Sequence, residues 1–339
     1  MALRFRPMQP EDVRECAEII KAHPVIGPRY GRAIEELNCA WLRLIGSEAM
    51  TTAVYEEVDG TAIRKCGVGV GLFVHPEFMR EVKTQPLFWF GAELVKRITA
   101  GRSPALSDRE VREANSSKGL NLVVWEALPC LDFAHRSDLF HLMIDAFRQI
   151  HRGFRLNEMI TSQAESVERL KWAVDAGGLF WDPAKSRYVN SLRKNAEKFV
   201  RKPHVVGITR ELELGRLGSW VGTLFDYQPP RFGFSQSEQR MLLAALVGRS
   251  GTDEELAAAL GVSLSTIKKM WLSVYRRTTD VQPKTIRDRA RSEAHERGKE
   301  KRRHLLAYLR EHPEELRPVS QKHLQQQPLV RKRIHRVRG

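Results

Sequence analysis

The strongest constraint on the fold is a series of helix starts in the last third of the chain. Ser235 and Glu238 have the spacing of a capping box, in which the serine side chain accepts a hydrogen bond from an early helix N–H and the glutamate reaches back. Thr252 and Glu255 repeat this pattern, and Gly261 supplies the residue type that tolerates the left-handed end of a helix. The sequence therefore predicts short helices separated by tight turns.

The helix expected after Gly261 has two different faces. Ser263 is expected to start it, and it should run from Leu264 to about Arg277. Side chains three and four positions apart share one face of a helix, so apolar and polar positions can be assigned to opposite sides. The expected inward residues are Ile267, Met270, Trp271 and Val274, and the expected outward residues are Ser265, Lys268, Lys269, Leu272 and Arg276.

The segment 234–277 resembles the LuxR-type helix-turn-helix family of DNA-binding domains. Three departures from the family pattern stand out: the turn before Thr252 is one residue longer, Met270 replaces the usual histidine, and Arg277-Thr278 replaces Lys-Leu. The matching positions are Glu238, Glu255, Leu256, Ala257, Leu260, Val262, Ser263, Thr266, Ile267, Lys268, Val274, Tyr275 and Arg277.

The resemblance implies a site for double-stranded DNA on the third helix of an all-α domain over residues 231–280. A recognition helix of this kind lies in the major groove and contacts DNA through its early residues. Lys268 and Lys269 are then the main DNA contacts, because a lysine can donate to phosphate or to guanine O6 and N7. Ser265, Thr266, Leu272 and Arg276 complete the expected DNA-binding set. The alternative is a solvated helix face that happens to be basic.

The first 190 residues are expected to form an α+β domain. A short strand over 3–8 leads into a helix that Pro10 opens, and Asp59-Gly60 suits the tight turn between strands over 52–58 and 61–74. The further expected strands are 120–125, 158–163 and 177–180, and the further expected helices are 92–98, 137–151 and 167–174.

The order of these elements is similar to that of the GNAT acyltransferase family, with RPMQPED early in the chain and VHPEF at residues 74–78. That family implies acetyl-CoA, whose pyrophosphate is held by backbone N–H groups of a glycine-containing loop at a helix N-terminus. The residues after Arg80 read EVKTQ and contain no glycine. We therefore expect no cofactor and no enzyme activity, and assign the domain to sensing or association. An acyltransferase with a DNA-binding appendage is the alternative function.

Two other patterns could suggest a ligand site in this domain. Three glycines alternate with other residues in CGVGVG at 66–71, which we interpret as close packing of a helix on the sheet and not as a phosphate cradle. Asp132, His135, Asp138 and His141 recur at three-residue intervals, but Pro129 and the loop-like residues after it disfavour one helix through all four. Ser137 or Asp138 is expected to cap a helix there, and no metal site or catalytic residue is predicted.

The excess positive charge lies near the C-terminus. The chain has 56 Lys and Arg against 41 Asp and Glu, and residues 281–339 alone carry 17 against 7. Residues 191–230, which end in paired prolines, are expected to connect the two domains. Residues 281–312 should form a basic helix and residues 313–339 a disordered basic tail. Beside a DNA-binding domain, phosphates are the favoured partner of these charges.

These features together predict a DNA-binding transcriptional regulator of bacterial type. Further candidate partners are RNA polymerase, a small-molecule ligand of the N-terminal domain and a second copy of the chain. No apolar stretch approaches the length of a membrane span, so we expect a cytoplasmic protein that does not bind membranes. The four cysteines form no C-x-x-C pair and are expected to be reduced.

Overall fold

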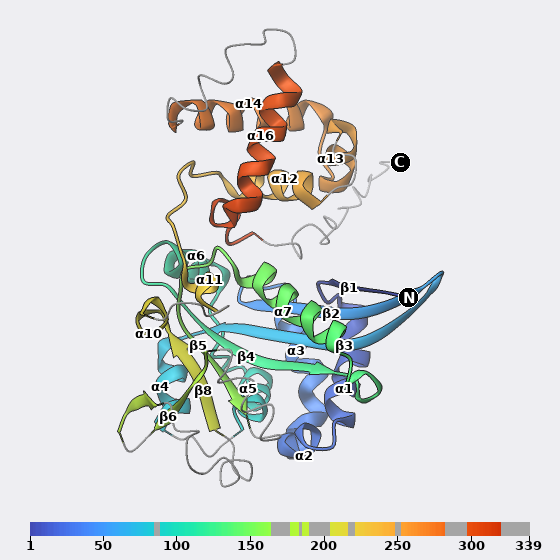
Figure 1. Ribbon diagram of the computed structural model, residues 1–339, viewed down its shortest axis with the longest axis vertical. Helices are drawn as coiled ribbons and strands as arrows, with labels where there is room; N and C mark the ends of the chain where they lie inside the picture. Colours follow the sequence, from blue (N-terminus) through green and yellow to red (C-terminus); the bar gives the residue numbers. More distant parts are fainter. Residues whose placement is uncertain are drawn as a thin grey trace, which may run out of the picture. The chain divides into compact units, whose positions relative to one another are not determined.

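The computed structural model describes residues 1–84, 89–163, 177–182, 185–189, 204–215, 221–247, 252–281 and 297–319. The chain divides into two compact units, Met1–Tyr227 and Gln228–Gly339, which are called the sheet unit and the helical unit below (Figure 1). It combines helices with one eight-stranded mixed sheet, in agreement with the α+β class expected from the sequence.

The strands of the sheet unit follow the order β1-β2-β3-β4-β5-β8-β6-β7. Only the pairing of β4 with β5 is parallel, and the other described pairs are antiparallel. The strands are β1 (Ala2–Arg6), β2 (Met50–Asp59), β3 (Ala62–Val74), β4 (Leu120–Pro129), β5 (Leu156–Gln163), β6 (Leu179–Asp182), β7 (Arg187–Val189) and β8 (His204–Thr209). Gly60, with φ 58°, makes the turn between β2 and β3, so the predicted hairpin is confirmed.

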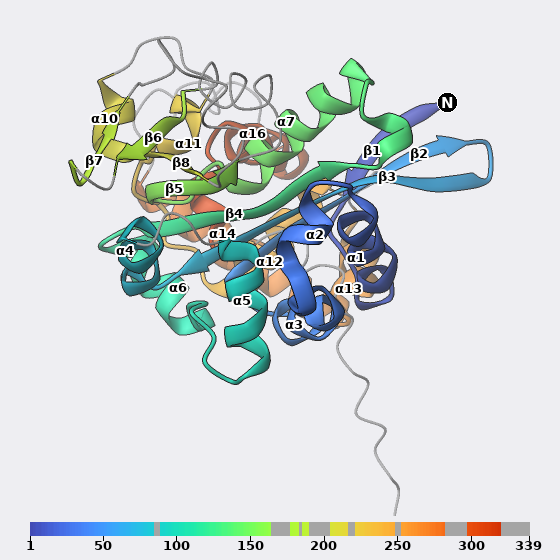
Figure 2. The same cartoon turned by 90° about the horizontal axis from the view of Figure 1, so that it is seen from below.

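Helices cover both faces of this sheet. Figure 2 shows α1, α2, α3 and α5 on one face and α7 on the other. The helices are α1 (Val13–Ala22), α2 (Ile26–Tyr30), α3 (Leu37–Leu44), α4 (Pro76–Thr84), α5 (Phe90–Thr99), α6 (Asp108–Ser116), α7 (Ser137–His151), α10 (Arg210–Leu214) and α11 (Gly222–Phe225). Shorter 3-10 turns are η1 (Pro10–Asp12), η2 (Gly31–Glu36) and η3 (Leu131–Phe133).

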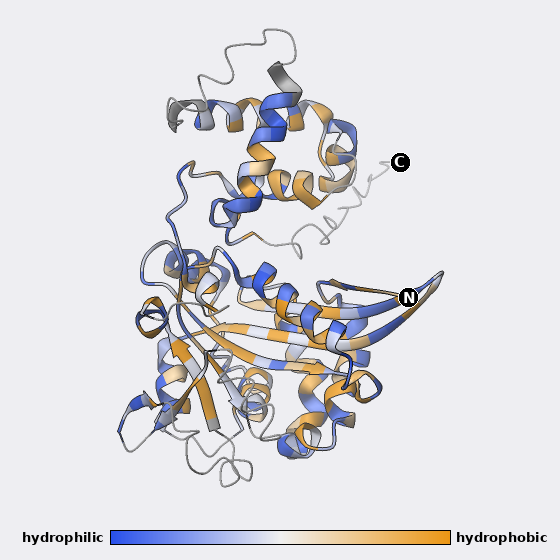
Figure 3. Cartoon of the chain, viewed as in Figure 1, coloured by the Kyte–Doolittle hydropathy of each residue, from blue (hydrophilic) through white to orange (hydrophobic). Residues whose placement is uncertain are grey.

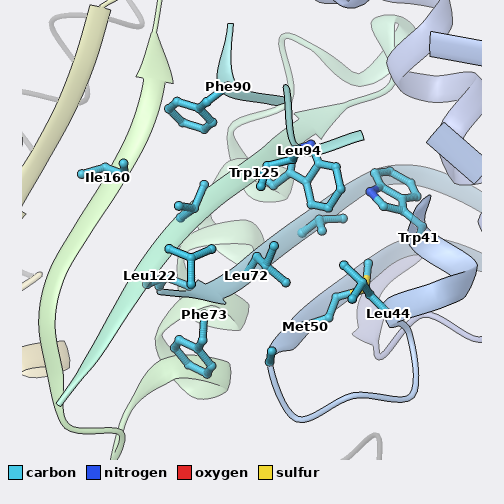
Figure 4. Close-up of a cluster of buried hydrophobic side chains, with 14 of the residues drawn as sticks. Trp41, Leu44, Met50, Leu72, Phe73, Phe90, Leu94, Leu122, Trp125 and Ile160 are labelled. Atoms are coloured by element: carbon cyan, nitrogen blue, oxygen red, sulfur yellow. The ribbon is translucent and has the colours of Figure 1, made fainter. Parts of the chain in front are cut away.

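The larger core lies between the sheet and the first of these helix layers. Trp41 of α3 and Trp125 of β4 meet edge to face, with ring centroids 6.2 Å apart, and Leu72 and Leu94 are buried in the same cluster (Figure 4). Colouring by hydropathy shows hydrophobic residues along much of β4 and hydrophilic residues on the outer sides of the helices (Figure 3). The sheet is thus a buried layer, as its apolar strands require.

The glycines of β3 allow the close packing on the α7 side. A Cβ atom at Gly71 would lie 2.5 Å from Thr51 Oγ1 and 3.2 Å from His151 Nε2 of α7. Thr51 Oγ1 and His151 Nε2 are themselves 2.9 Å apart. The interpretation of CGVGVG as a packing motif is therefore confirmed at Gly71.

The prediction that residues 191–230 only connect the two domains is wrong for the residues that the structure describes there. Strand β8 lies between β5 and β6, and Leu224 and Phe225 of α11 are buried in the large core. The six residues of β8 are too few to show a period, and their pairing with β5 joins segments far apart in sequence. The helix expected at 167–174 lies outside the described residues.

The helical unit contains α12 (Gln236–Val247), α13 (Asp253–Leu260), α14 (Leu264–Val281), α16 (Arg297–Glu311) and η4 (Pro313–Leu316). Its core draws apolar side chains from all five elements. The buried members include Met241, Leu242, Leu256, Ile267, Trp271, Val274, Leu305, Leu309 and Leu316.

The prediction of disorder from residue 313 onward is wrong for residues 313–319. Glu315 is 1% exposed, and its carboxylate accepts hydrogen bonds from the backbone N–H of Arg231 at 2.9 Å and of Phe232 at 3.1 Å. Leu316 and Val319 are buried. A single carboxylate that binds a distant backbone leaves no apolar pattern in the sequence, which is why composition missed it. Residues 320–339 and 282–296 lie outside the described part.

Candidate nucleic-acid interface

The first capping box joins α12 to α14. Glu238 Oε2 accepts from the N–H of Ser235 at 2.7 Å and lies 3.3 Å from Nε of Arg277 on α14. Burial raises the pKa of this carboxyl, but hydrogen bonds from Ser273 and Ser235 and the charge of Arg277 outweigh burial, so the pKa lies below its usual range. The predicted cap is confirmed, and through Arg277 the same glutamate also contacts the second half of α14.

The turn between α13 and α14 is as short as the sequence predicts. Thr252 and Glu255 form the second capping box at the start of α13, with the Glu255 N–H donating to Thr252 Oγ1 at 3.2 Å. Gly261 ends α13 in the left-handed conformation, with φ 63° and ψ 34°. The Ser263 hydroxyl accepts from the Thr266 N–H at 3.2 Å and starts α14. Three residues therefore separate the two helices.

The buried face of α14 contains Ile267, Trp271 and Val274, as predicted. Helix α16 covers Trp271: the guanidinium carbon of Arg302 lies 4.4 Å from the centroid of the tryptophan ring. Nη1 of Arg302 also lies 3.0 Å from Asp253 Oδ1, at the first residue of α13. This contribution of α16 was not predicted, because nothing in the local sequence around Arg302 indicates its distant partners.

The opposite face of α14 is exposed. Ser265, Lys268, Lys269, Leu272 and Arg276 are all exposed, and Thr266 is half-buried. Among the described residues, no ion pair involves either lysine or Arg276. The helical unit thus brings together the six residues expected to bind DNA as a surface with three cations, which we call the α14 face.

Two of the hydroxyls on the α14 face also serve the helix start. Ser263 Oγ lies 2.9 Å from Ser265 Oγ and 2.8 Å from Thr266 Oγ1. These hydroxyls can still accept or donate one further bond each, because a hydroxyl has one donor and two acceptor positions. Ser265 and Thr266 therefore contribute to the start of the helix and remain able to contact a ligand.

Two neighbouring arginines of α14, Arg276 and Arg277, differ in their contacts. Arg277 donates from Nη1 to the Gly233 carbonyl at 3.2 Å, besides its contact with Glu238. Arg276 points to the exposed side and is part of the α14 face. The sequence placed Arg277 in the family pattern and Arg276 in the expected DNA-binding set. In the fold, Arg277 makes structural contacts, whereas Arg276 has no ion pair among the described residues.

The two aspartates that recur with histidines at three-residue intervals in the sheet unit form ion pairs with arginines. Asp132 pairs with Arg64, and Asp138 pairs with Arg136 at 2.6 Å. Among the residues with described coordinates, no group of three His, Cys, Asp or Glu side chains could hold a metal ion. The expected side-chain cap of α7 is wrong: the N-cap position is Arg136, which makes no capping hydrogen bond.

Residues 81–84, which follow Arg80, lie inside α4 and not in a loop before a helix, and Gln85 lies outside the described residues. Glu81 pairs with Arg97, and Lys83 Nζ lies 2.9 Å from Glu158 Oε1. The described positions after Arg80 are therefore helical, and the resemblance to the acyltransferase family stays a prediction.

No protein-family model matches the chain, and no curated protein matches it. Among solved structures, the chain is similar to an uncharacterized protein from Bacillus halodurans, with 10% identity over 62% of this chain and 85% of that chain. The TM-score is 0.32, which carries no argument about fold or function. Within the described ranges, no helix is both long and apolar enough to cross a membrane.

Proposed function

We propose that this protein is a DNA-binding transcriptional regulator, in which α13, the turn at Gly261 and α14 act as a LuxR-type helix-turn-helix. The observation that carries the proposal is the α14 face, where three cations are exposed on a helix that packs against α12, α13 and α16 through a shared core. The resemblance of residues 234–277 to that family supports the same assignment.

The dimensions of the α14 face suit a DNA groove. The major groove is about 12 Å wide and admits an α-helix. Lys268 and Arg276 are eight residues apart, which corresponds to about 12 Å along a helix axis. The two cations can therefore reach phosphates at separate points, while the residues between them lie nearest the base edges.

The competing explanation is a basic helix face that only keeps the protein soluble. Such a face would bind DNA weakly and without preference for sequence, because phosphate attraction carries no sequence information. A recognition helix would instead enrich particular duplexes. Sequence preference therefore separates the two explanations.

The test starts from the full-length protein and a pool of random duplexes. Bound duplexes are enriched, and the affinity of the recovered site is measured for the wild type and for the double variant Lys268→Ala/Lys269→Ala. The control Lys118→Ala/Lys185→Ala removes two exposed lysines of the sheet unit and changes the net charge equally. We expect the first variant to lose about 1 to 3 kcal/mol per contact and the control to bind like the wild type. Failure to enrich any sequence, or wild-type affinity in the Lys268→Ala/Lys269→Ala variant, would reject the proposal.

In this proposal the sheet unit senses a ligand or associates with a second copy, and the regulator acts in the cytoplasm with RNA polymerase as its downstream partner. The alternative, an acyltransferase with a DNA-binding appendage, predicts specific binding of acetyl-CoA. Calorimetric titration of the full chain with acetyl-CoA separates the two, because the regulator is expected to release no heat of specific binding.

A further inference from the structure

The α14 face has an apolar residue at its centre. Leu272 is 70% exposed, more than any other described large apolar side chain except Met1. A single exposed leucine is ordinary on a protein surface and by itself indicates no function. The neighbours of Leu272 make it unusual: Lys268 and Lys269 lie in the preceding turn and Arg276 in the following turn, all exposed.

We infer that Leu272 contacts the 5-methyl group of a thymine in the major groove and makes the protein select that base. The inference rests on the proposed function and adds which base the helix reads. Leucine has no hydrogen-bond donor or acceptor in its side chain. The thymine methyl is the apolar group that unmodified DNA presents at its base edges in the major groove.

The spacing of residues on α14 is consistent with a contact between Leu272 and a base. Leu272 is four residues from Lys268 and four from Arg276, or about 6 Å along the axis from each. Cations on both sides can hold the two phosphate chains that border the groove, so the side chain between them faces the base edges. Contact with a methyl group then removes apolar surface of both partners from water.

Charge selects nucleic acid over a protein partner for this face. An apolar protein surface docked on Leu272 would have to cover three cations that have no ion-pair partner among the described residues. Covering a charge without a partner is costly. DNA offers phosphates for the cations and a methyl group for the leucine on one surface. If Leu272 instead bound a protein, its replacement would not change the affinity for DNA.

The experiment uses the full-length protein and the duplex recovered by enrichment. Each thymine of the site is replaced singly by deoxyuridine, which removes only the methyl group and keeps the pairing with adenine. Dissociation constants are measured for the wild type, Leu272→Ala and Leu272→Met. Val247→Ala is the matched control, because Val247 is an exposed apolar residue on α12 of the same unit.

At one thymine position we expect the wild type to lose about fourfold in affinity on replacement, which corresponds to about 0.8 kcal/mol for one buried carbon group. Leu272→Ala is expected to bind the thymine and deoxyuridine duplexes equally. Leu272→Met and the control should keep the difference, because both retain an apolar side chain at position 272. Circular dichroism is expected to show the same fold for all variants.

The outcomes distinguish this inference from the proposed function. If the wild type enriches no duplex, the proposed function fails and the inference fails with it. If the wild type binds a defined site but no deoxyuridine replacement weakens binding, only the reading of thymine by Leu272 is overturned. The same holds if Leu272→Ala keeps the full sensitivity to the missing methyl group, or if it binds all duplexes like the wild type.

Discussion

Arg302 of α16 lies over the ring of Trp271 on α14, with its guanidinium carbon 4.4 Å from the ring centroid. The same side chain pairs with Asp253 at the start of α13. One residue therefore contacts both helices of the proposed DNA-binding motif. Because a guanidinium is planar and is attracted to the face of an aromatic ring, Arg302 favours one orientation of α14 relative to α13.

Replacement of Arg302 should destabilise the helical unit. Arg302→Ala loses both the contact with the ring and the pair with Asp253, and we expect a loss of about 1 to 3 kcal/mol. Arg302→Lys keeps the charge but not the planar group, so it should recover only part of this loss. Urea unfolding of the full chain, followed by circular dichroism, measures the effect. Arg303→Ala is the control, since Arg303 pairs with Glu300 within α16. Equal losses in the two alanine variants would contradict the role of Arg302.

Trp271 and Leu272 are adjacent on α14 and should respond oppositely to truncation. Trp271 is buried, so Trp271→Ala should cost about 3 to 5 kcal/mol and unfold much of the helical unit. Leu272→Ala removes an exposed side chain and should change the free energy of unfolding by less than about 0.5 kcal/mol. Thermal unfolding of the full chain compares the two variants. A melting curve for Trp271→Ala that coincides with that of the wild type would show that the core of the unit lies elsewhere.

The pH dependence of the helical unit should include a contribution from Glu238. Its pKa is lowered in the fold, so its stabilising effect is fully present above the ordinary glutamate pKa of about 4.3 and is lost as the pH falls through the lower pKa of the folded state. Glu238→Gln should therefore flatten the loss of stability in acid. The exposed Glu254→Gln is the control. Denaturant unfolding at several pH values tests this, and parallel curves for the wild type and Glu238→Gln would exclude the contribution.

Local patterns predicted the elements that local interactions determine. Helix α7 occupies the expected range Ser137–His151, because its apolar spacing extends over four turns. The β2–β3 hairpin follows from Asp59-Gly60, and the two faces of α14 follow from the spacing of Ile267 and Trp271. The six residues of the α14 face were all proposed from sequence, although their binding partner stays a prediction.

The sequence could not predict contacts between segments that are distant along the chain. Strand β8 pairs in the interior of the sheet, where the sequence indicated a connector. Glu315 binds the backbone of Arg231 and Phe232, which lie more than eighty residues earlier. Such polar contacts depend on the folded arrangement and leave no period in the sequence. A C-terminal truncation must therefore keep the residues after Pro313 that contact the helical unit.

The position of a C-terminal truncation should decide whether the helical unit folds. A chain cut after Pro313 lacks Glu315, Leu316 and Val319, all of which are buried, and Leu316 belongs to the core of this unit. It should lose several kcal/mol through lost burial and through backbone N–H groups left without their carboxylate. A chain cut after Val319 keeps these contacts and should melt like the wild type. Equal stability of the two truncated chains would show that η4 contributes nothing.

The chain cut after Val319 also isolates the effect of the last basic residues on DNA binding. The removed segment has no acidic residue, and nothing in its sequence would aim its charges at particular bases, so its contribution should be non-specific. Each phosphate contact that is lost should make the slope of log affinity against log salt shallower by about 0.9. Specific and random duplexes should weaken by the same factor, so the ratio between them should not change. An unchanged slope would assign the segment to another partner, and a reduced ratio would mean that it reads sequence. The basic residues removed are Lys322, Arg331, Lys332, Arg333, Arg336 and Arg338.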